Sequence, residues 1–132
     1  MNIGLIKNMY DKIKDEKSSG ATEYTVRHNR RGEEVYRMEF HRDNYQITLY
    51  HYETKTLQLQ LSSNSQPVIA DFYGESKSDA DSMNTLLHLY YDNCFARVPG
   101  KFRYGPVMGF VFDKGDVKIK VRDSHLFNLI NS

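Results

Sequence analysis

The fold of this chain is decided by residues 34–61, which contain three runs: EVYRMEFH (34–41), YQITLYHY (45–52) and KTLQLQL (55–61). In each run apolar and polar residues alternate, which is the pattern of a β-strand with one buried face. Three residues separate the first pair of runs, and two separate the second pair. Connections this short join only antiparallel neighbours, so the stretch predicts a three-stranded meander.

The alternation divides these side chains between two faces of the predicted sheet. The face that must be covered carries Tyr36, Met38, Phe40, Ile47, Leu49, Leu57, Leu59 and Leu61. The other face carries Arg37, Glu39, His41, Thr48, Tyr50, Tyr52, Gln58 and Gln60. This polar and aromatic mixture indicates a surface that stays hydrated or contacts a partner, and it points to no particular chemistry.

Length and composition indicate one ordinary globular domain over residues 1–132. The chain has 132 residues, of which 39% are hydrophobic and 27% are charged. A chain of this size can bury one core without disulfide or metal staples. The formal net charge is only +1, so any contact with nucleic acid would depend on local patches.

The cysteine content and the absence of apolar runs indicate a cytoplasmic protein. Cys94 is the only cysteine, which excludes an intrachain disulfide and cysteine-rich zinc sites and is consistent with a reducing compartment. The N-terminal residues MNIGLIKNMYDKIKDE are interrupted by charges and do not resemble a signal peptide. No run reaches membrane-spanning length, so we expect no membrane partner.

Two helices are predicted, one before the meander in the sequence and one after it. The first should span residues 2–16, where Ile3, Ile6, Met9, Tyr10 and Ile13 recur at helical spacing. The second should span residues 79–92, where Ser78 and Asp81 have the spacing of a capping box. Both apolar stripes are expected to cover the same face of the sheet.

Further strands should extend the meander in both directions. Residues 21–28 alternate again, and residues 68–72 follow a proline that favours an edge position. Residues 107–112 and 117–121 predict a later hairpin. A short final helix is expected, with Asp123 as its cap and Leu126, Phe127 and Ile130 as its anchors. The predicted class is α+β, with an antiparallel meander of about five to seven strands and helices on one face.

Two segments are candidates for contact with phosphate. Arg30 and Arg31 stand at the tip of a predicted hairpin turn, although a solvated turn is the favoured explanation for them. Residues 95–106 (FARVPGKFRYGP) interleave basic and aromatic residues, which suits phosphate contact combined with base stacking. The same mixture is common at protein interfaces and in plain solvent loops.

Charge is segregated along the chain. Between residues 95 and 122, seven basic residues stand against two acidic ones, a local charge of +5. The basic residues are Arg97, Lys101, Arg103, Lys114, Lys118, Lys120 and Arg122. In the last predicted strand, Lys118, Lys120 and Arg122 face outward, and the acidic counterweight lies earlier, in residues 71–92.

The sequence lacks the common catalytic motifs and so gives no support for an enzyme. The sequence contains no glycine-rich nucleotide motif, no GxSxG and no HExxH. Glu39 and His41 share a predicted strand face, where the pair would suit acid–base chemistry, but a polar surface ladder explains them without chemistry. We therefore expect no catalytic residue, no metal and no cofactor, and retain an enzyme using this pair as a minority hypothesis.

Residues 45–60 resemble the middle of TBP-like domains, as found at the N-terminus of type 3 bacterial ribonuclease H and of RNase LS-type toxins. The matching positions are Ile47-Thr48-Leu49-Tyr50, Lys55 and Leu57-Gln58-Leu59-Gln60, and the order helix, four strands, helix over residues 3–92 also agrees. The resemblance implies a curved antiparallel sheet whose exposed face contacts nucleic acid and which has no catalytic residue of its own. The chain departs from the pattern at Leu61, where glycine is usual, and the hairpin at 107–121 has no counterpart.

Our leading hypothesis is a non-enzymatic binding module that presents this sheet face and the 97–104 segment to nucleic acid or a nucleoprotein. The candidate contact residues are Arg27, Arg30, Arg31, Arg37, Tyr50, Tyr52, Gln58, Arg97, Lys101, Arg103 and Tyr104. The alternative is a small protein-binding inhibitor or adaptor, such as a phage-type anti-defence factor that blocks a host enzyme. A homodimer formed through sheet edges or faces is compatible with either hypothesis.

Overall fold

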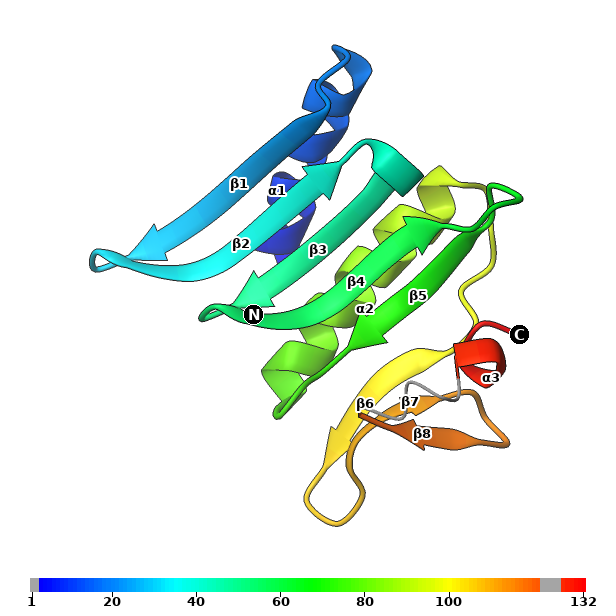
Figure 1. Ribbon diagram of the computed structural model, residues 1–132. Coiled ribbons are helices and arrows are strands. Elements are labelled where there is room, and N and C mark those ends of the chain that lie inside the picture. The colour runs from blue at the N-terminus through cyan, green and yellow to red at the C-terminus, as the bar shows by residue number, and fades with distance from the viewer. Residues whose placement is uncertain (1–2, 122–126) are drawn as a thin grey trace.

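The computed structural model describes residues 3–121 and 127–132 (Figure 1). The helices are α1 (Ile3–Ser18), α2 (Lys77–Asn93) and α3 (Phe127–Ile130), with a 3-10 turn at Asp43–Tyr45. The strands are β1 (Glu23–Arg30), β2 (Glu33–His41), β3 (Gln46–His51), β4 (Thr54–Leu61), β5 (Pro67–Phe72), β6 (Lys101–Gly105), β7 (Gly109–Asp113) and β8 (Lys118–Lys120). The predicted α+β class is confirmed.

The strands divide between two antiparallel sheets instead of extending one meander. Strands β1 to β5 form a five-stranded sheet in sequence order, and β6 to β8 form a separate three-stranded sheet. The predicted meander of residues 34–61 is therefore confirmed as β2, β3 and β4. Residues 101–104, expected in an irregular segment, are instead part of β6, which pairs with β7 throughout.

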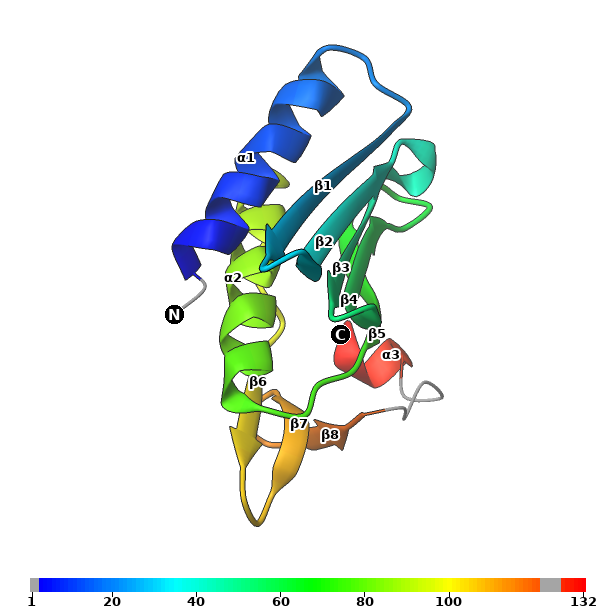
Figure 2. The same ribbon diagram turned by 90° about the vertical axis from the view of Figure 1, so that its left-hand side faces the viewer.

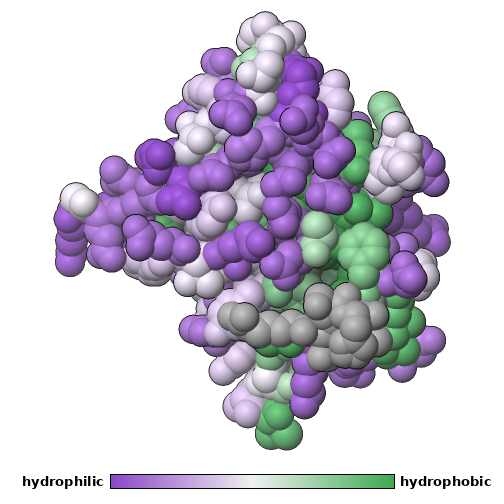
Figure 3. Space-filling model, viewed as in Figure 1, coloured by the Kyte–Doolittle hydropathy of each residue, from purple (hydrophilic) through white to green (hydrophobic). Residues whose placement is uncertain are grey.

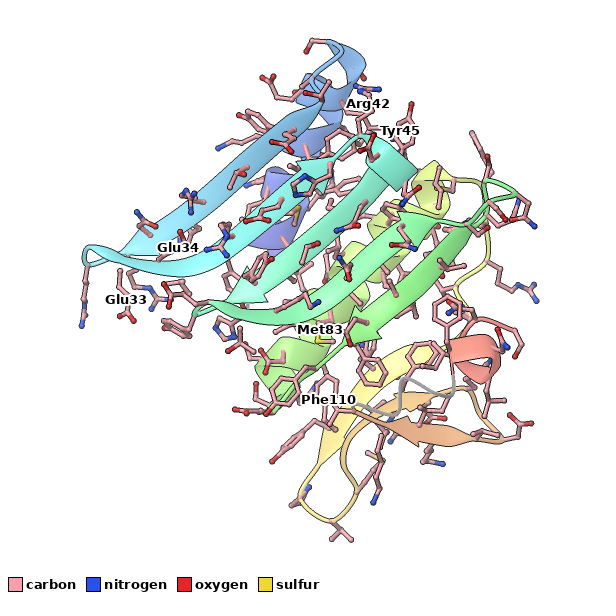
Figure 4. The ribbon with its side chains drawn as sticks, in the orientation of Figure 1. Glu33, Glu34, Arg42, Tyr45, Met83 and Phe110 are labelled. Carbon is pink, nitrogen blue, oxygen red and sulfur yellow. The ribbon has the colours of Figure 1, made fainter. Side chains whose placement is uncertain are left out.

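Both long helices cover one face of the five-stranded sheet and leave the other open (Figure 2). Of the eight side chains predicted to face inward, all but Leu61 are at most 2% exposed, and Leu61 is half-buried. Met83 of α2 meets them from the helix side (Figure 4). Burial of large apolar side chains contributes about 1.5–3 kcal/mol each, so this layer supplies most of the driving force for folding.

Helix α2 begins two residues earlier than the sequence pattern suggested. Its N-cap is Ser76, whose side chain accepts a hydrogen bond from the Asp79 amide at 3.1 Å. The Asp79 carboxylate in turn accepts from the Glu75 amide at 3.0 Å. The predicted capping box of Ser78 and Asp81 was therefore wrong in register, because the Ser76–Asp79 pair has the same spacing and also fixes the preceding residue.

Arg42 ties the β2–β3 connection to the end of α1. Its guanidinium donates to the carbonyl oxygen of Lys17 in the last turn of α1 at 2.7 Å and to that of Ala21, just past the helix, at 2.8 Å; cations are favoured at a helix C-terminus. Tyr45 lies beside it (Figure 4), and the Tyr45 carbonyl accepts from the Tyr90 hydroxyl of α2 at 2.6 Å. The connection thus fixes both helices to the sheet.

The three-stranded sheet packs against the β5 end of the molecule through aromatic rings. Phe72 of β5 lies 5.2 Å from Phe102 of β6 and 6.2 Å from Phe112 of β7, measured between ring centroids. Phe110 completes this cluster beside the β5–α2 connection (Figure 4). The expected caps and anchors Asp123 and Leu126 lie outside the described residues, as does Arg122.

Candidate binding surfaces

The open face of the five-stranded sheet carries a chain of ion pairs across β1 and β2. Arg27 Nη1 lies 2.7 Å from one oxygen of Glu34, and Arg37 Nη1 lies 2.7 Å from the other (Glu34 is labelled in Figure 4). Arg37 also donates from Nε to Glu39 at 2.8 Å, and its guanidinium stacks on Tyr50 at 4.1 Å. The hydrogen bond from Arg27, with that from Arg37, lowers the pKa of Glu34. Both arginines are thus held by carboxylates.

Glu39 and His41, the pair considered for acid–base chemistry, do lie together on this face. Glu39 Oε1 lies 3.7 Å from His41 Nε2, and His41 Nδ1 lies 3.3 Å from Glu23 of β1. The second oxygen of Glu39 is occupied by Arg37. The histidine therefore lies in a row of polar and charged side chains, an arrangement that cross-strand pairing produces on exposed sheet faces.

The charges on this open face nearly cancel. The paired groups are the cations Arg27, Arg37 and Lys55 and the carboxylates of Glu23, Glu34, Glu39 and Asp71. The surface is strongly hydrophilic (Figure 3). With three cations against four carboxylates, it has no excess positive charge to attract a polyanion.

The β1–β2 turn exposes two further arginines. Arg30 lies opposite Glu33, and the turn itself is formed by Arg31 and Gly32, which have φ angles of 54° and 78°. Positive φ at both positions is the geometry of a two-residue hairpin loop, which matches the twist of the strands. Arg30 and Arg31 are both exposed, so they stand at the tip as expected, far along the hairpin from the other sheet.

The outward face of the three-stranded sheet is strongly basic. Strand pairing aligns Lys101 with Asp113 and Lys118 in one row, and Arg103 with Lys120 across Val111 in the next. Arg103 donates to Asp113 at 2.8 Å, and this hydrogen bond, with one from the Gly115 amide, lowers the pKa of Asp113.

All four cations on this face are exposed at the surface. Among the described residues, no carboxylate forms an ion pair with Lys101, Lys118 or Lys120. Counting only the described residues, four cations therefore share a face with one carboxylate, which leaves a charge of +3. This is the opposite of the balanced open face on the larger sheet.

A hollow of about 220 Å³ adjoins this basic face, between α2 and β6. It is bordered by the ion pair of Lys77 with Asp81, by Lys101 and Arg103, and by the half-exposed ring of Tyr104. Asn84 fixes its floor, because its carboxamide bonds both to the N–H and to the C=O of Phe102. The hollow thus places an aromatic ring beside two cations of the basic face.

A histidine–aspartate pair that the sequence reasoning missed joins β3 to the start of α2. His51 Nδ1 lies 2.8 Å from Asp79 Oδ1, and the His51 ring stacks on Tyr36 at 4.5 Å and lies 4.7 Å from Tyr52. Burial acts to raise the pKa of Asp79, but hydrogen bonds from His51 and from the Glu75 amide hold it below its usual value. Asp79 is therefore a carboxylate, and His51 Nδ1 carries the proton that it shares.

This pair borders a hollow of about 300 Å³ next to the β3–β4 turn. The turn residues Tyr52 and Glu53 have φ angles of 48° and 68°, and Tyr52 is 52% exposed. No spacing rule links residues 51 and 79, so the pair could be found only from the fold. The contacts describe an anchor that ties the hairpin to the N-cap of α2.

The most exposed aromatic side chain, Phe95, is held just after α2 in an unfavourable backbone conformation. The Phe95 amide bonds to the Asp92 carbonyl at 3.0 Å, and the Ala96 amide bonds to the Tyr91 carbonyl at 2.9 Å, the two bonds of a Schellman motif. Phe95 has φ 56° at the position where glycine is usual, and it is 98% exposed. A groove of about 600 Å³ begins beside it at Tyr91, Ala96 and Arg97.

The predicted contact residues therefore lie on separate surfaces. Arg27, Arg37, Tyr50 and Gln58 share the open face of the larger sheet, with Tyr52 in the adjoining turn and Arg30 and Arg31 at the far hairpin tip. Lys101 and Arg103 lie on the smaller sheet, Tyr104 at the end of β6, and Arg97 in the exposed segment before it. Lys118 and Lys120 complete the basic face. Their outward alternation was visible in the sequence, but only the fold sets β8 near β6.

Within residues 3–121 and 127–132, no helix is long and apolar enough to span a membrane. The same residues contain no cluster of three or more histidine, cysteine, aspartate or glutamate side chains that could hold a metal ion. Comparison with protein-family models, curated proteins and solved structures finds no significant match to this chain. The resemblance to TBP-like domains therefore stays a prediction.

Proposed function

We propose that this protein is a binding module without catalytic chemistry, and that it contacts the phosphate backbone of nucleic acid through the outward face of its three-stranded sheet. The observation that carries the proposal is the alignment of Lys101, Arg103, Lys118 and Lys120 on one face, with Asp113 as the only carboxylate among them in the part of the chain that the structure describes. Phosphate contacts of this kind supply most of the affinity of sequence-independent binding.

The geometry of the strands suits a polyanion. Residues two apart in a strand are separated by about 6.6 Å, and neighbouring strands by about 4.8 Å, so the four cations cover a compact patch. Tyr104 borders the adjoining hollow together with Lys101 and Arg103, which places a ring for base stacking beside two phosphate-binding cations. Arg97 is exposed in the segment leading to β6 and borders the separate groove of about 600 Å³.

The test is the salt dependence of binding to labelled single-stranded and double-stranded DNA and RNA. Four phosphate contacts predict that the logarithm of the association constant falls against the logarithm of salt with a slope of about −3.6 for a duplex. Absence of binding to all four probes at low salt would overturn the proposal. A cytoplasmic location, as the single cysteine suggests, would give the protein access to such ligands.

A second candidate function is supported by Phe95: a small protein-binding inhibitor or adaptor, such as an anti-defence factor. A phenylalanine that is 98% exposed and held at positive φ lowers stability without packing against its own chain, and hot spots of protein interfaces are often aromatic. A photo-crosslinking residue at position 95 would identify the partner. In the purified complex, Phe95→Ala should then weaken binding at least about tenfold, which corresponds to about 1.4 kcal/mol. Unchanged affinity would exclude this anchor.

A further inference from the structure

The edges of the two sheets are protected unequally. Edge strands expose unpaired N–H and C=O groups, which act as templates for another strand unless something satisfies them. In the described residues the edge strands are β1, β5, β6 and β8. At β5, the Asn131 carboxamide accepts from the Ile69 N–H at 2.7 Å and donates to the Ile69 C=O at 3.0 Å. At β6, Asn84 makes the same pair of bonds with Phe102.

Strand β1 has no comparable cover from residues 3–121 and 127–132. It is eight residues long, whereas β8 has three, and among these described residues β2 is its only neighbour in the sheet. Figure 1 shows no element of the described chain running along its outer side. Helix α1 instead packs on the inner face of the sheet (Figure 2). The longest open edge of the described molecule is therefore that of β1.

The side chains of β1 are complementary to a second copy of the same strand. Antiparallel pairing centred on Thr25 sets Glu23 opposite Arg27 of the second copy, because such pairing reverses the residue order. The outward face keeps Glu23, Thr25 and Arg27, and the inward face pairs Tyr24 with Val26 of the second copy, so both faces continue across the junction. The register centred on Arg27 instead would set two arginines opposite each other.

Charges on an edge strand usually discourage pairing, but in this register the facing charges are of opposite sign. The side chains of Glu23 and Arg27 are 74% and 55% exposed. Arg27 uses Nη1 for Glu34, which leaves other N–H groups of its guanidinium for a second carboxylate. Opposite charges placed directly across antiparallel strands are stabilising, whereas like charges are destabilising.

We infer that the protein forms a homodimer in which β1 pairs with β1 of a second copy around a two-fold axis at Thr25, joining the two five-stranded sheets into one. The interface is isologous, so each copy contributes the carboxylate of one charge pair and the arginine of the other. This inference does not depend on what the three-stranded sheet binds, because the basic face and the β1 edge are on different sheets.

Sedimentation over about 1–200 µM protein tests the inference, since this range detects micromolar dissociation constants. The wild type should form a dimer, and Glu23→Arg should weaken it at least about tenfold, because the substituted arginine would face Arg27 of the second copy. The double exchange of Glu23→Arg with Arg27→Glu restores opposite charges and should restore the dimer. A wild type that remains monomeric, or a dimer that Glu23→Arg leaves unchanged, would overturn the inference.

Cysteine crosslinking provides a readout that does not depend on charge. In a Cys94→Ser background, Thr25→Cys places two thiols across the two-fold axis, where oxidation should yield a covalent dimer. Asn29→Cys is the matched control, because in this register position 29 lies opposite position 21 and no thiol faces it. A crosslink at Asn29→Cys and none at Thr25→Cys would contradict the proposed register.

Discussion

The carboxamide of Asn84 in α2 replaces a β-strand at the edge of β6: its Oδ1 lies 2.7 Å from Phe102 N, and its Nδ2 lies 2.8 Å from Phe102 O. Phe102 is only 1% exposed, so its backbone groups have little access to water. One side chain thereby fixes the three-stranded sheet, and the basic face that it carries, to the main body of the protein.

Replacing Asn84 by alanine should be strongly destabilising. The change leaves the N–H and C=O of Phe102 without partners, and each unsatisfied buried group costs about 1–3 kcal/mol. Urea unfolding should therefore show a loss of about 2–4 kcal/mol. Asn8→Ala, at an exposed position of α1, is the control and should change stability by less than about 0.5 kcal/mol. Equal effects of the two variants would show that the Asn84 bridge is unimportant.

Replacing Phe95 by glycine should raise stability. Glycine accepts the positive φ of this position without strain, whereas an L-residue loses about 1 kcal/mol, and an almost fully exposed ring has no packing to lose. Phe95→Ala is the matched control, because it removes the ring but keeps the Cβ atom. The melting temperature should rise for Phe95→Gly only. A higher melting temperature for both variants would show that the exposed ring, and not the backbone conformation, lowers the stability of the wild type.

The His51–Asp79 pair should make part of the stability depend on pH. The pKa of Asp79 is lower in the folded protein than its ordinary value of 3.8. The unfolded chain therefore binds the proton more readily, so the stabilisation is complete above that value and is lost as the pH falls through the folded pKa.

Asp79→Asn should accordingly reduce the free energy of unfolding by about 1.5–3 kcal/mol at neutral pH, since it removes a charge-assisted hydrogen bond. Urea unfolding at a series of pH values should show the difference from wild type shrinking below pH 3.8. Asp81→Asn, which breaks only an exposed pair with Lys77, serves as the control. A difference that stays constant on acidification would contradict the assignment.

Gly100 should be required for the approach of the α2–β6 segment to β7. A Cβ atom at this position would lie 2.6 Å from the backbone oxygen of Asp113 and 2.9 Å from the Phe112 ring. Because a backbone oxygen cannot rotate away, Gly100→Ala should destabilise the protein by about 1–3 kcal/mol. Gly4→Ala, in α1 with open space around it, should instead stabilise by about 0.5–1 kcal/mol. The two alanine variants are therefore expected to differ in sign.

The alternation of apolar and polar residues was sufficient to predict the core of the five-stranded sheet. It was not sufficient to predict the basic face of the three-stranded sheet. The alternation of residues 34–61 identified β2 to β4 and their faces, because a strand of this sheet has one buried side. The separation of β6 to β8 into a second sheet depends on contacts such as Asn84 with Phe102, which no local pattern encodes. The start of α2 was misplaced because two serine–aspartate pairs with the same spacing overlap.

The candidate surface changed for the same reason. Arg37 and Tyr50 were correctly assigned to the open face, but the carboxylates that hold Arg37 come from positions two and three residues away, Glu39 and Glu34. Outward alternation was expected for Lys118 and Lys120, yet their grouping with Lys101 follows only from the order β6-β7-β8. The carboxylates that hold Arg37 are thus visible on its own strand, whereas the charge of the three-stranded face depends on strand pairing.

The most direct test of the proposed nucleic-acid contact compares two double variants. The quantity measured is the slope of the logarithm of the association constant for a duplex against the logarithm of the salt concentration. Replacing Lys118 and Lys120 by glutamine removes two phosphate contacts and should reduce the slope for duplex binding by about 1.8. Replacing Lys12 and Lys14 of α1 by glutamine removes the same amount of charge at a site away from the three-stranded sheet. This control variant should leave the slope unchanged. Equal slopes for the two variants would contradict the central claim that the basic face of the three-stranded sheet binds the phosphate backbone.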